Sequence, residues 1–312
     1  MSHIIDLHLL DIITKRYSTM TAIHLNTINA DGINMFYREA GLPEAPTLLL
    51  LHGFPSSSHQ YRNLIPLLSK KYHLIAPDLP GFGFTEIPES RNYKYTFDSL
   101  TTSIESFLHE LNIQKFSMYI FDYGAPIGLR LALRHPQAIQ SIISQNGNAY
   151  TEGLGDFWTP FQKLWKAQTP EELSASKEPI KSIISLDSTK WQYNTGTPPT
   201  HLHNIAPESY TLDYALLSRP GNAEIQLDLF YDYRTNLEFY PAFQKFFREE
   251  NVPVLAVWGR NDEIFVKAGA EAFKRDCGNL VVEFLDAGHF AVETHVEEIA
   301  EAILRFKEKF AL

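Results

Sequence analysis

The chain has 312 residues, enough for one large α/β domain or two domains of ordinary size. Its composition, 44% hydrophobic and 21% charged, is that of an ordinary globular protein. The formal net charge of −10 argues against sequence-independent binding to nucleic acid, which needs a basic face, and against a polybasic patch for a membrane surface. Cys277 is the single cysteine, so an internal disulfide is excluded and we expect an intracellular, cytoplasmic protein.

The first 21 residues contain an apolar run that resembles a signal peptide only superficially. Asp6 and Asp11 interrupt the run, and no basic region precedes it. We interpret residues 1–21 as an extension outside the core fold. Because no stretch reaches about 18 consecutive apolar residues, no transmembrane helix is predicted.

Short apolar runs predict the strands of a sheet. Two of them, 24–28 and 33–39, form an opening hairpin around Asp31-Gly32. The others are nearly all apolar, as strands buried on both faces should be; they are 47–52, 73–78, 116–121, 141–145, 254–259 and 280–286. Amphipathic stretches between them predict helices, at 98–112, 124–135, 266–276 and 293–310. This alternation predicts an α/β fold with a mostly parallel eight-stranded sheet flanked by helices.

The alternation is interrupted from residue 148 to residue 238. This region is rich in Tyr, Trp, Pro and Asn, and it contains short helical patterns but no apolar run of strand length. We interpret 148–238 as a helical cap inserted between two strands. Residues 22–147 and 239–312 then form the core.

The segment "IFDYG" (120–124) lies where a buried strand passes directly into a helix. It has the form x-x-nucleophile-x-Gly, in which a sharp turn exposes one side chain at the carboxyl edge of the sheet. Asp122 occupies the nucleophile position, although Ile120 replaces the usual first glycine. The alternative is that Asp122 only caps the following helix.

The segment His52-Gly53-Phe54-Pro55 follows another buried strand. Gly53 allows the backbone to approach a ligand closely. The backbone N–H groups of Phe54 and Tyr123 would together hold a developing oxyanion. We interpret His52 itself as structural.

Two further strands end beside chemically useful side chains. Asp262 follows the strand at 254–259, and His289 follows the strand at 280–286. Each alone is explained equally well as a turn aspartate or a surface histidine. The chain order nucleophile, acid, histidine, each after its own strand, is that of α/β-hydrolases and predicts a catalytic triad of Asp122, Asp262 and His289.

The motifs "HGFP", "APDLPGFGFT", "FDYG", "WGRND" and "GHF" together resemble the α/β-hydrolase superfamily. Within it they resemble the branch with an Asp nucleophile, the epoxide hydrolases and haloalkane dehalogenases. The resemblance covers residues 22–312 and is weakest across the cap. "GFGF" (81–84) lacks the further Gly and the Lys of a phosphate loop, so we interpret it as a turn of the family.

An Asp nucleophile changes the reaction that the site favours. A carboxylate needs no base to activate it and can displace a leaving group from an sp³ carbon, which leaves an alkyl ester on Asp122. His289, oriented by Asp262, would then activate a water that hydrolyses this ester. The amides of Phe54 and Tyr123 would stabilise the oxyanion of that second step.

The leaving group separates the two subfamilies. The resemblance to epoxide hydrolases implies two cap tyrosines that donate to the departing oxygen, and "FYDYRTN" (230–236) assigns one of them to Tyr233. The other is expected early in the cap, where this sequence has Trp158 and Trp165 but no tyrosine. Tyr150 and Tyr193 are possible substitutes.

Dehalogenases commonly bind halide with the Trp after the nucleophile, together with an Asn in the "HGNP" position or a second Trp in the cap. Those two core positions hold Tyr123 and Phe54 here, so only Trp165 or Trp158 would donate an N–H. Epoxide hydrolysis is therefore favoured, with haloalkane dehalogenation as the alternative. The aromatic cap implies a small, largely apolar substrate.

A third hypothesis is a non-catalytic ligand-binding protein on a hydrolase fold, because fold does not determine function. The sequence contains no H-E-x-x-H motif, no cysteine cluster and no nucleotide-binding fingerprint, so neither a metal nor a cofactor is expected. It does not indicate an oligomeric state.

Overall fold

The computed structural model describes residues 22–312, and the predicted extension 1–21 lies outside the described residues. One eight-stranded sheet runs through the molecule in the order β1-β2-β4-β3-β5-β6-β7-β8. The strands are β1 (His24–Ala30), β2 (Ile33–Ala40), β3 (Thr47–Leu51), β4 (His73–Pro77), β5 (Phe116–Phe121), β6 (Ile139–Gln145), β7 (Val254–Gly259) and β8 (Leu280–Leu285). The pairs β1–β2 and β2–β4 are antiparallel and the others parallel, as the sequence predicted.

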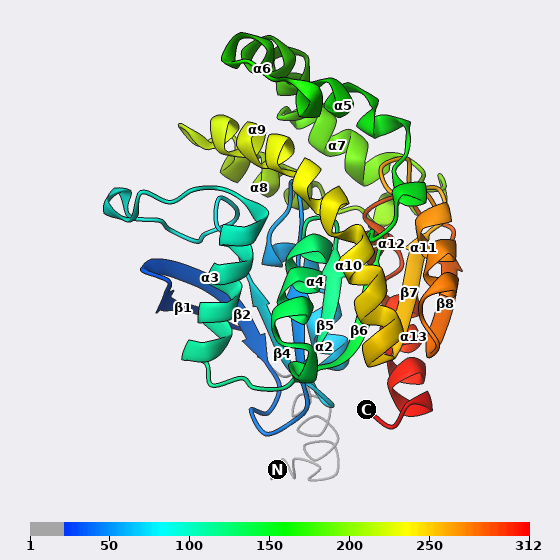
Figure 1. The fold of residues 1–312 in the computed structure, drawn as a ribbon. Coiled ribbons are helices and arrows are strands. Elements are labelled where there is room, and N and C mark those ends of the chain that lie inside the picture. Colours follow the sequence, from blue (N-terminus) through cyan, green and yellow to red (C-terminus); the bar gives the residue numbers. More distant parts are fainter. Residues whose placement is uncertain (1–21) are drawn as a thin grey trace, which may run out of the picture.

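Helices cover both faces of the sheet (Figure 1). On one face, α3 (Phe97–Glu110), α4 (Gly124–Arg134), α10 (Arg234–Glu250) and α11 (Ala268–Ala272) contribute to one apolar core. On the other face, α2 (Leu64–Leu68), α12 (Ala291–Thr294) and α13 (Val296–Lys309) contribute to a second core. The two cores form because β3 and β5 are buried on both sides, which is typical of parallel strands.

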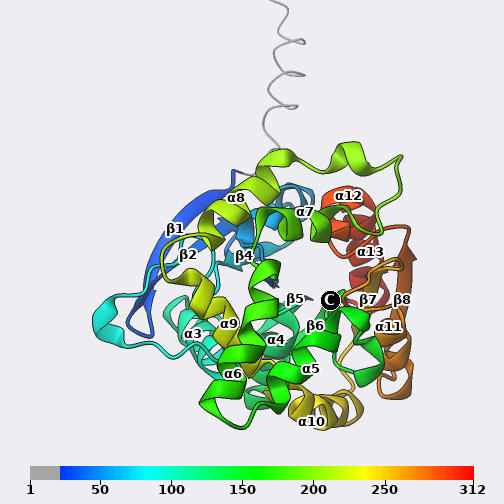
Figure 2. The same cartoon turned by 90° about the horizontal axis from the view of Figure 1, so that it is seen from above.

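Five helices between β6 and β7 form a layer above the sheet, which we call the cap (Figure 1). They are α5 (Thr159–Lys166), α6 (Pro170–Lys177), α7 (Leu186–Asn194), α8 (Pro207–Leu217) and α9 (Asn222–Asp232). Seen from above, they are arranged around the ends of β5 and β6 (Figure 2). Helix α10 crosses position 238, the predicted boundary between cap and core, and its side chains join the core next to α4.

Two predicted helices differ from the observed ones. The stretch 293–310 is divided into α12 and α13, because the backbone of His295 leaves the helical region at φ −135° and ψ 42°. The stretch 266–276 is α11 followed by a short 3₁₀ turn at Phe273–Arg275. In both places the apolar period continues through the break, so the sequence pattern alone does not reveal it.

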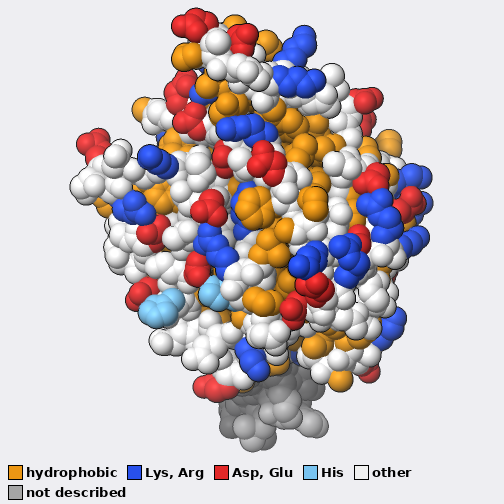
Figure 3. All heavy atoms as spheres, viewed as in Figure 1, with side chains coloured by type: hydrophobic (Ala, Val, Ile, Leu, Met, Phe, Trp, Pro, Cys, Tyr) orange, Lys and Arg blue, Asp and Glu red, His pale blue; other side chains and the backbone are white. Residues whose placement is uncertain are grey.

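Among the described residues, none of the helices is both long and apolar enough to cross a membrane. Acidic and basic side chains are interspersed on the face shown in Figure 3.

Candidate active site

Asp122 lies in the sharp turn between β5 and α4. Its φ of 47° is in the left-handed region, which is strained for a residue other than glycine and is typical of functional sites. Gly124 makes the turn possible, since a Cβ there would lie 2.2 Å from the carbonyl oxygen of Leu51. This backbone places the Asp122 carboxylate above the carboxyl edge of the sheet rather than along α4, where the helix-cap alternative would need it.

Two backbone amides face the carboxylate of Asp122. The N–H of Phe54 donates to Oδ1 over 2.6 Å, and the N–H of Tyr123 also acts to lower the pKa of the carboxylate. A Cβ on Gly53 would lie 2.2 Å from the same Oδ1, so only glycine permits this approach. The structure thus brings both predicted oxyanion-binding amides to the carboxylate of Asp122.

His289 lies between two carboxylates. Its Nδ1 is 2.8 Å from Oδ2 of Asp262, and its Nε2 is 3.8 Å from Oδ2 of Asp122. All three side chains are buried, and His289 Nε2 has no hydrogen-bond partner among the described residues. The bond to Asp262 places the proton of a neutral imidazole on Nδ1, so that Nε2 can accept a proton.

Asn146 is a site residue that the sequence analysis missed. It follows β6, and its Nδ2 donates to Oδ2 of Asp262 over 2.6 Å, the same oxygen that bonds His289. Its Oδ1 accepts from the backbone N–H of Gly259. The available signal was its position directly after a buried parallel strand, at the edge of the sheet that holds Asp122.

Burial and charge shift the pKa values of the two central groups in the same direction. Burial raises the pKa of Asp122 to about 6, although His289 and the backbone hydrogen bonds oppose this rise. Burial acts to lower the pKa of His289, but the charge and hydrogen bond of Asp262, together with the charge of Asp122, raise it above 6.5. Opposite charges within a buried site stabilise each other's ionised form.

His52 has the structural role that we expected. Its Nε2 accepts the backbone N–H of Leu79 over 2.9 Å, while Nδ1 bonds the carbonyl of Gly53. The carboxylate of Asp78 accepts the backbone N–H of Phe84, which belongs to the turn at 81–84, and also the backbone N–H of Ser58. The Asp78 side chain already occupies the N–H of Phe84, which a phosphate loop would offer to a phosphate. The interpretation of 81–84 as a family turn is therefore favoured over a phosphate loop.

Among the cap candidates, Tyr233 packs against Tyr123, the residue after the predicted nucleophile. It is the single residue between α9 and α10, and its ring centroid is 5.9 Å from that of Tyr123. The hydroxyl of Tyr123 is buried and has no hydrogen-bond partner in the described part of the chain. Burial raises the pKa of both tyrosines well above 10; the charge of Asp122 adds to this rise for Tyr123, and Tyr240 adds to it before Asp122 for Tyr233, so both hydroxyls remain protonated.

The two tryptophans use their N–H groups elsewhere. Trp158 donates to the carbonyl of Ile264 over 3.0 Å, and Trp165 donates to the carbonyl of Phe230 over 2.8 Å. Each indole has one N–H, so neither is available to a halide while these bonds persist. The ring of Trp158 stacks on Tyr233 at 4.3 Å, which gives it a packing role.

The structure places the two substitute tyrosines away from this arrangement. The hydroxyl of Tyr193 donates to Oδ2 of Asp213 over 2.5 Å, and its ring stacks on Phe290 at 3.9 Å. Tyr150 packs edge-on against Phe273, on the side of the core covered by α11. Burial, with a smaller contribution from Cys277, raises the pKa of its hydroxyl. Tyr193 is therefore engaged as a donor, and Tyr150 belongs to a different cluster.

In the described residues, His, Cys, Asp and Glu side chains do not form a group of three or more that could hold a metal ion. The candidate site consists of the Asp122 carboxylate, His289 with Asp262 and Asn146, two backbone amides and two phenolic side chains.

Known proteins are similar to this chain in sequence and in fold. The α/β hydrolase fold family matches residues 46–296. An uncharacterized hydrolase of Saccharomyces cerevisiae is 54% identical over 275 residues, which cover 88% of this chain and 93% of the yeast protein. A haloalkane dehalogenase of Mycolicibacterium paratuberculosis is 34% identical over 282 residues, 88% of each chain. The crystal structure of an epoxide hydrolase from Vigna radiata superposes with a TM-score of 0.69 at 26% identity, covering 92% of this chain and 98% of that one.

The chain belongs to the α/β-hydrolase family. It is a hydrolase of this fold, close to the epoxide hydrolases and the haloalkane dehalogenases.

Proposed function

We propose that the protein hydrolyses epoxides through a covalent ester on Asp122. The observation that carries the proposal is the set of groups around the carboxylate. The ring of Tyr123, the residue after Asp122, packs against the ring of Tyr233 at 5.9 Å, and both hydroxyls are protonated, whereas the indole N–H groups of Trp158 and Trp165 are donated to backbone carbonyls. An epoxide oxygen needs a proton donor as its C–O bond breaks, and a neutral phenol supplies one.

In the first step, Oδ2 of Asp122 attacks an epoxide carbon. The C–O bond of the epoxide breaks, its electron pair goes to the departing oxygen, and a tyrosine hydroxyl gives that oxygen a proton. The products are an ester of Asp122 that carries a hydroxyl group and a tyrosinate. Oδ2 is the attacking atom because Oδ1 is the oxygen bonded by the Phe54 N–H.

In the second step, water attacks the carbonyl carbon of the ester and gives its proton to Nε2 of His289. The negative charge then develops on Oδ1, to which the Phe54 N–H already donates. The backbone N–H of Tyr123 also favours negative charge on this group. The intermediate collapses, the diol oxygen takes the proton from His289, and the proton left on Asp122 returns through solvent to the tyrosinate. The net reaction is epoxide plus water to a vicinal diol.

Loss of charge on Asp122 assists the second step. The negative charge of Asp122 is one cause of the raised pKa of His289 in the free enzyme. Ester formation removes that charge, so the pKa of His289 falls in the intermediate and the imidazole is more readily neutral. Neutral imidazole is the form that accepts a proton from water.

Incorporation of solvent oxygen tests the covalent mechanism. In a single turnover in H₂¹⁸O, with enzyme in excess over an aromatic or alkyl epoxide, we expect the label in the Asp122 carboxylate and an unlabelled first diol. Peptide mass spectrometry of the segment that contains Asp122 reports the label, and the segment that contains Asp262 is the internal control. A labelled diol with unlabelled Asp122 would contradict the ester.

Haloalkane dehalogenation is the second candidate, because the Mycolicibacterium paratuberculosis relative bears that name. It would use the same ester and would need only a different partner for the leaving group. Halide release from a panel of chloro- and bromoalkanes, compared with diol formation from epoxides of the same carbon skeleton, separates the two. A non-catalytic binding protein would release neither product.

A further inference from the structure

The position of Tyr233 depends on a junction between two helices. Helix α9 ends at Asp232 and α10 begins at Arg234, so Tyr233 is the only residue between them. Helix α9 belongs to the cap and α10 packs on the core. The contacts of the residues on either side of Tyr233, together with the interaction of its hydroxyl with Tyr240, therefore influence where that hydroxyl lies.

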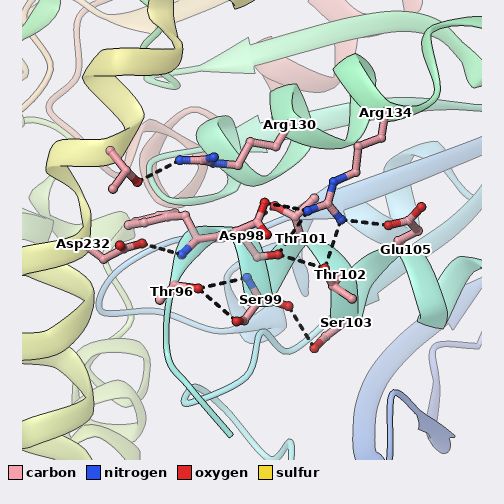
Figure 4. Close-up of polar contacts among 12 residues, drawn as sticks. Thr96, Asp98, Ser99, Thr101, Thr102, Ser103, Glu105, Arg130, Arg134 and Asp232 are labelled. Atoms are coloured by element: carbon pink, nitrogen blue, oxygen red, sulfur yellow. Dashed lines mark hydrogen bonds and ion pairs between the residues drawn. The ribbon is translucent and has the colours of Figure 1, made fainter.

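Asp232 bonds the junction to α3. Its Oδ2 accepts the backbone N–H of Phe97, the first residue of α3, over 2.8 Å (Figure 4). Thr96, the residue before the helix, accepts the N–H of Ser99 with its own side chain. The first N–H groups of a helix lack partners within it, and a carboxylate there is favourable against the helix dipole. A side chain 135 residues away along the chain thus completes the cap of α3.

Phe97 packs directly against both proposed donors. Its ring meets the ring of Tyr123 edge-on at a centroid distance of 4.9 Å and that of Tyr233 at 5.5 Å. The residue that Asp232 holds by its backbone is therefore packed against both tyrosines. A shift of Asp232 relative to Phe97 would change the position of Tyr233 relative to Tyr123.

Arg130 holds the other side of the junction. Its guanidinium donates to Oγ1 of Thr235 and to Oδ1 of Asn236, each over 2.9 Å, and lies 3.9 Å above the ring of Phe239. Figure 4 shows Arg130 on α4 reaching toward α10, beside Asp232 and the start of α3. Because α4 begins directly after Asp122 and Tyr123, this contact ties α10 to the turn that holds the proposed nucleophile.

We propose that Asp232 is a positioning residue that fixes the Tyr233 hydroxyl at the site by capping α3. The inference rests on the proposed function of Tyr233 as a proton donor to an epoxide oxygen. Asp232 does not touch the reacting atoms and acts through Tyr233. Misplacement of a reacting group by about 1 Å is enough to cost up to a hundredfold in rate.

A double-mutant cycle with Tyr233→Phe tests the inference. We expect Asp232→Ala to lower the rate constant of ester formation in a single turnover by about tenfold in the wild-type background, and by less than about twofold when Tyr233 is already Phe. Asp232→Asn keeps an oxygen that accepts the Phe97 N–H, so it should restore the rate to within about threefold of wild type. Should Asp232→Ala not fold, Asp232→Glu displaces the carboxylate and should show the same dependence on Tyr233.

Asp98 provides a matched control. It is also an acidic residue in the first turn of α3, but it is exposed and pairs with Arg134 over 2.6 Å. Asp98→Ala should leave the rate of ester formation within about twofold of wild type, since exposed ion pairs contribute little. Equal losses from Asp232→Ala in both backgrounds, or an equal loss from Asp98→Ala, would overturn the inference.

Hydrogen exchange separates failure of this inference from failure of the proposed function. If the wild-type enzyme formed no ester with any epoxide, the proposed function would fail, while the effect of the contact between Asp232 and Phe97 could still be measured. In that case faster amide exchange over residues 228–236 in Asp232→Ala than in Asp98→Ala supports the positioning role. Identical exchange in the two variants overturns it.

Discussion

The Nε2 atom of His289 lies 3.8 Å from Oδ2 of Asp122, beyond the range of a direct hydrogen bond. A hydroxyl nucleophile would need its base in contact, because the base must remove the hydroxyl proton. An ionised carboxylate has no proton to lose, so the separation does not hinder its attack. It leaves Nε2 free to accept a proton from a water approaching the carbonyl carbon of an Asp122 ester.

Replacement of His289 should trap the proposed ester. His289→Gln removes the base for the second step and leaves Asp122 able to attack, so one substrate equivalent should accumulate on the protein. Intact-protein mass spectrometry after incubation with epoxide detects an adduct of the full substrate mass. His295→Gln, at a buried histidine outside the site, is the control and should turn over without accumulation. The double variant with Asp122→Asn should carry no adduct.

The two phenolic hydroxyls should each contribute to ester formation. General acid catalysis is typically worth about 10²–10⁴ in rate, so with the role shared, Tyr233→Phe or Tyr123→Phe should lower the single-turnover rate by about ten- to a hundredfold. Trp165→Phe should stay within about threefold, because its N–H is donated to the carbonyl of Phe230. A large loss in Trp165→Phe alongside halide release from haloalkanes would favour dehalogenation.

The two chemical steps should depend on pH in the same direction. Asp122 must be ionised to attack, and burial raises its pKa to about 6, so ester formation should fall as the pH drops below about 6. His289 must be neutral for ester hydrolysis, and its pKa should be lower in the ester than in the free enzyme. Pre-steady-state rates of both steps between pH 5 and 10 measure the two values. Hydrolysis that titrates at a higher pH than His289 of the free enzyme, measured by NMR, would contradict this.

The charge of Asp122 should destabilise the fold. A carboxyl group whose pKa is raised on folding, here from 3.8 to about 6, costs stability above the folded pKa, and that cost vanishes below the unfolded pKa. Asp122→Asn should therefore raise the free energy of unfolding at pH 8 by up to about 3 kcal/mol, from a shift of roughly two units. The gain should shrink as the pH falls from about 6 to below 4. Denaturant unfolding at pH 8 and pH 4 measures it, with the exposed Asp98→Asn as a control that should show no gain.

Much of the architecture followed from local patterns. Each of the eight strands overlaps a predicted one, and β3, β4, β5 and β7 are nearly all apolar because they are buried on both faces of the sheet. The order of Asp122, Asp262 and His289 placed each residue after its own parallel strand, and such strands end at one edge of the sheet. That is why three residues spread over 168 positions (122–289) could be predicted to meet from sequence.

The hydrogen-bond donors of the cap were predicted less well from the sequence, and the reason is physical. The indole N–H groups donate to distant backbone carbonyls; that of Trp158 donates to the carbonyl of Ile264, 106 residues away along the chain. No local period specifies which distant backbone group a side chain will meet. The same holds for Asn146, whose bond to Asp262 spans 116 residues.

The sequence by itself therefore determined the sheet, the sharp turn at Asp122 and the identity of the predicted triad, since these depend on hydrophobic periodicity and on residues next to strand ends. Only the tertiary structure decided which cap groups remain available as donors. A side chain with a single N–H or O–H can donate to one partner at a time. Packing between distant segments decides whether Trp165, Tyr193 or Tyr233 donates to another part of the protein.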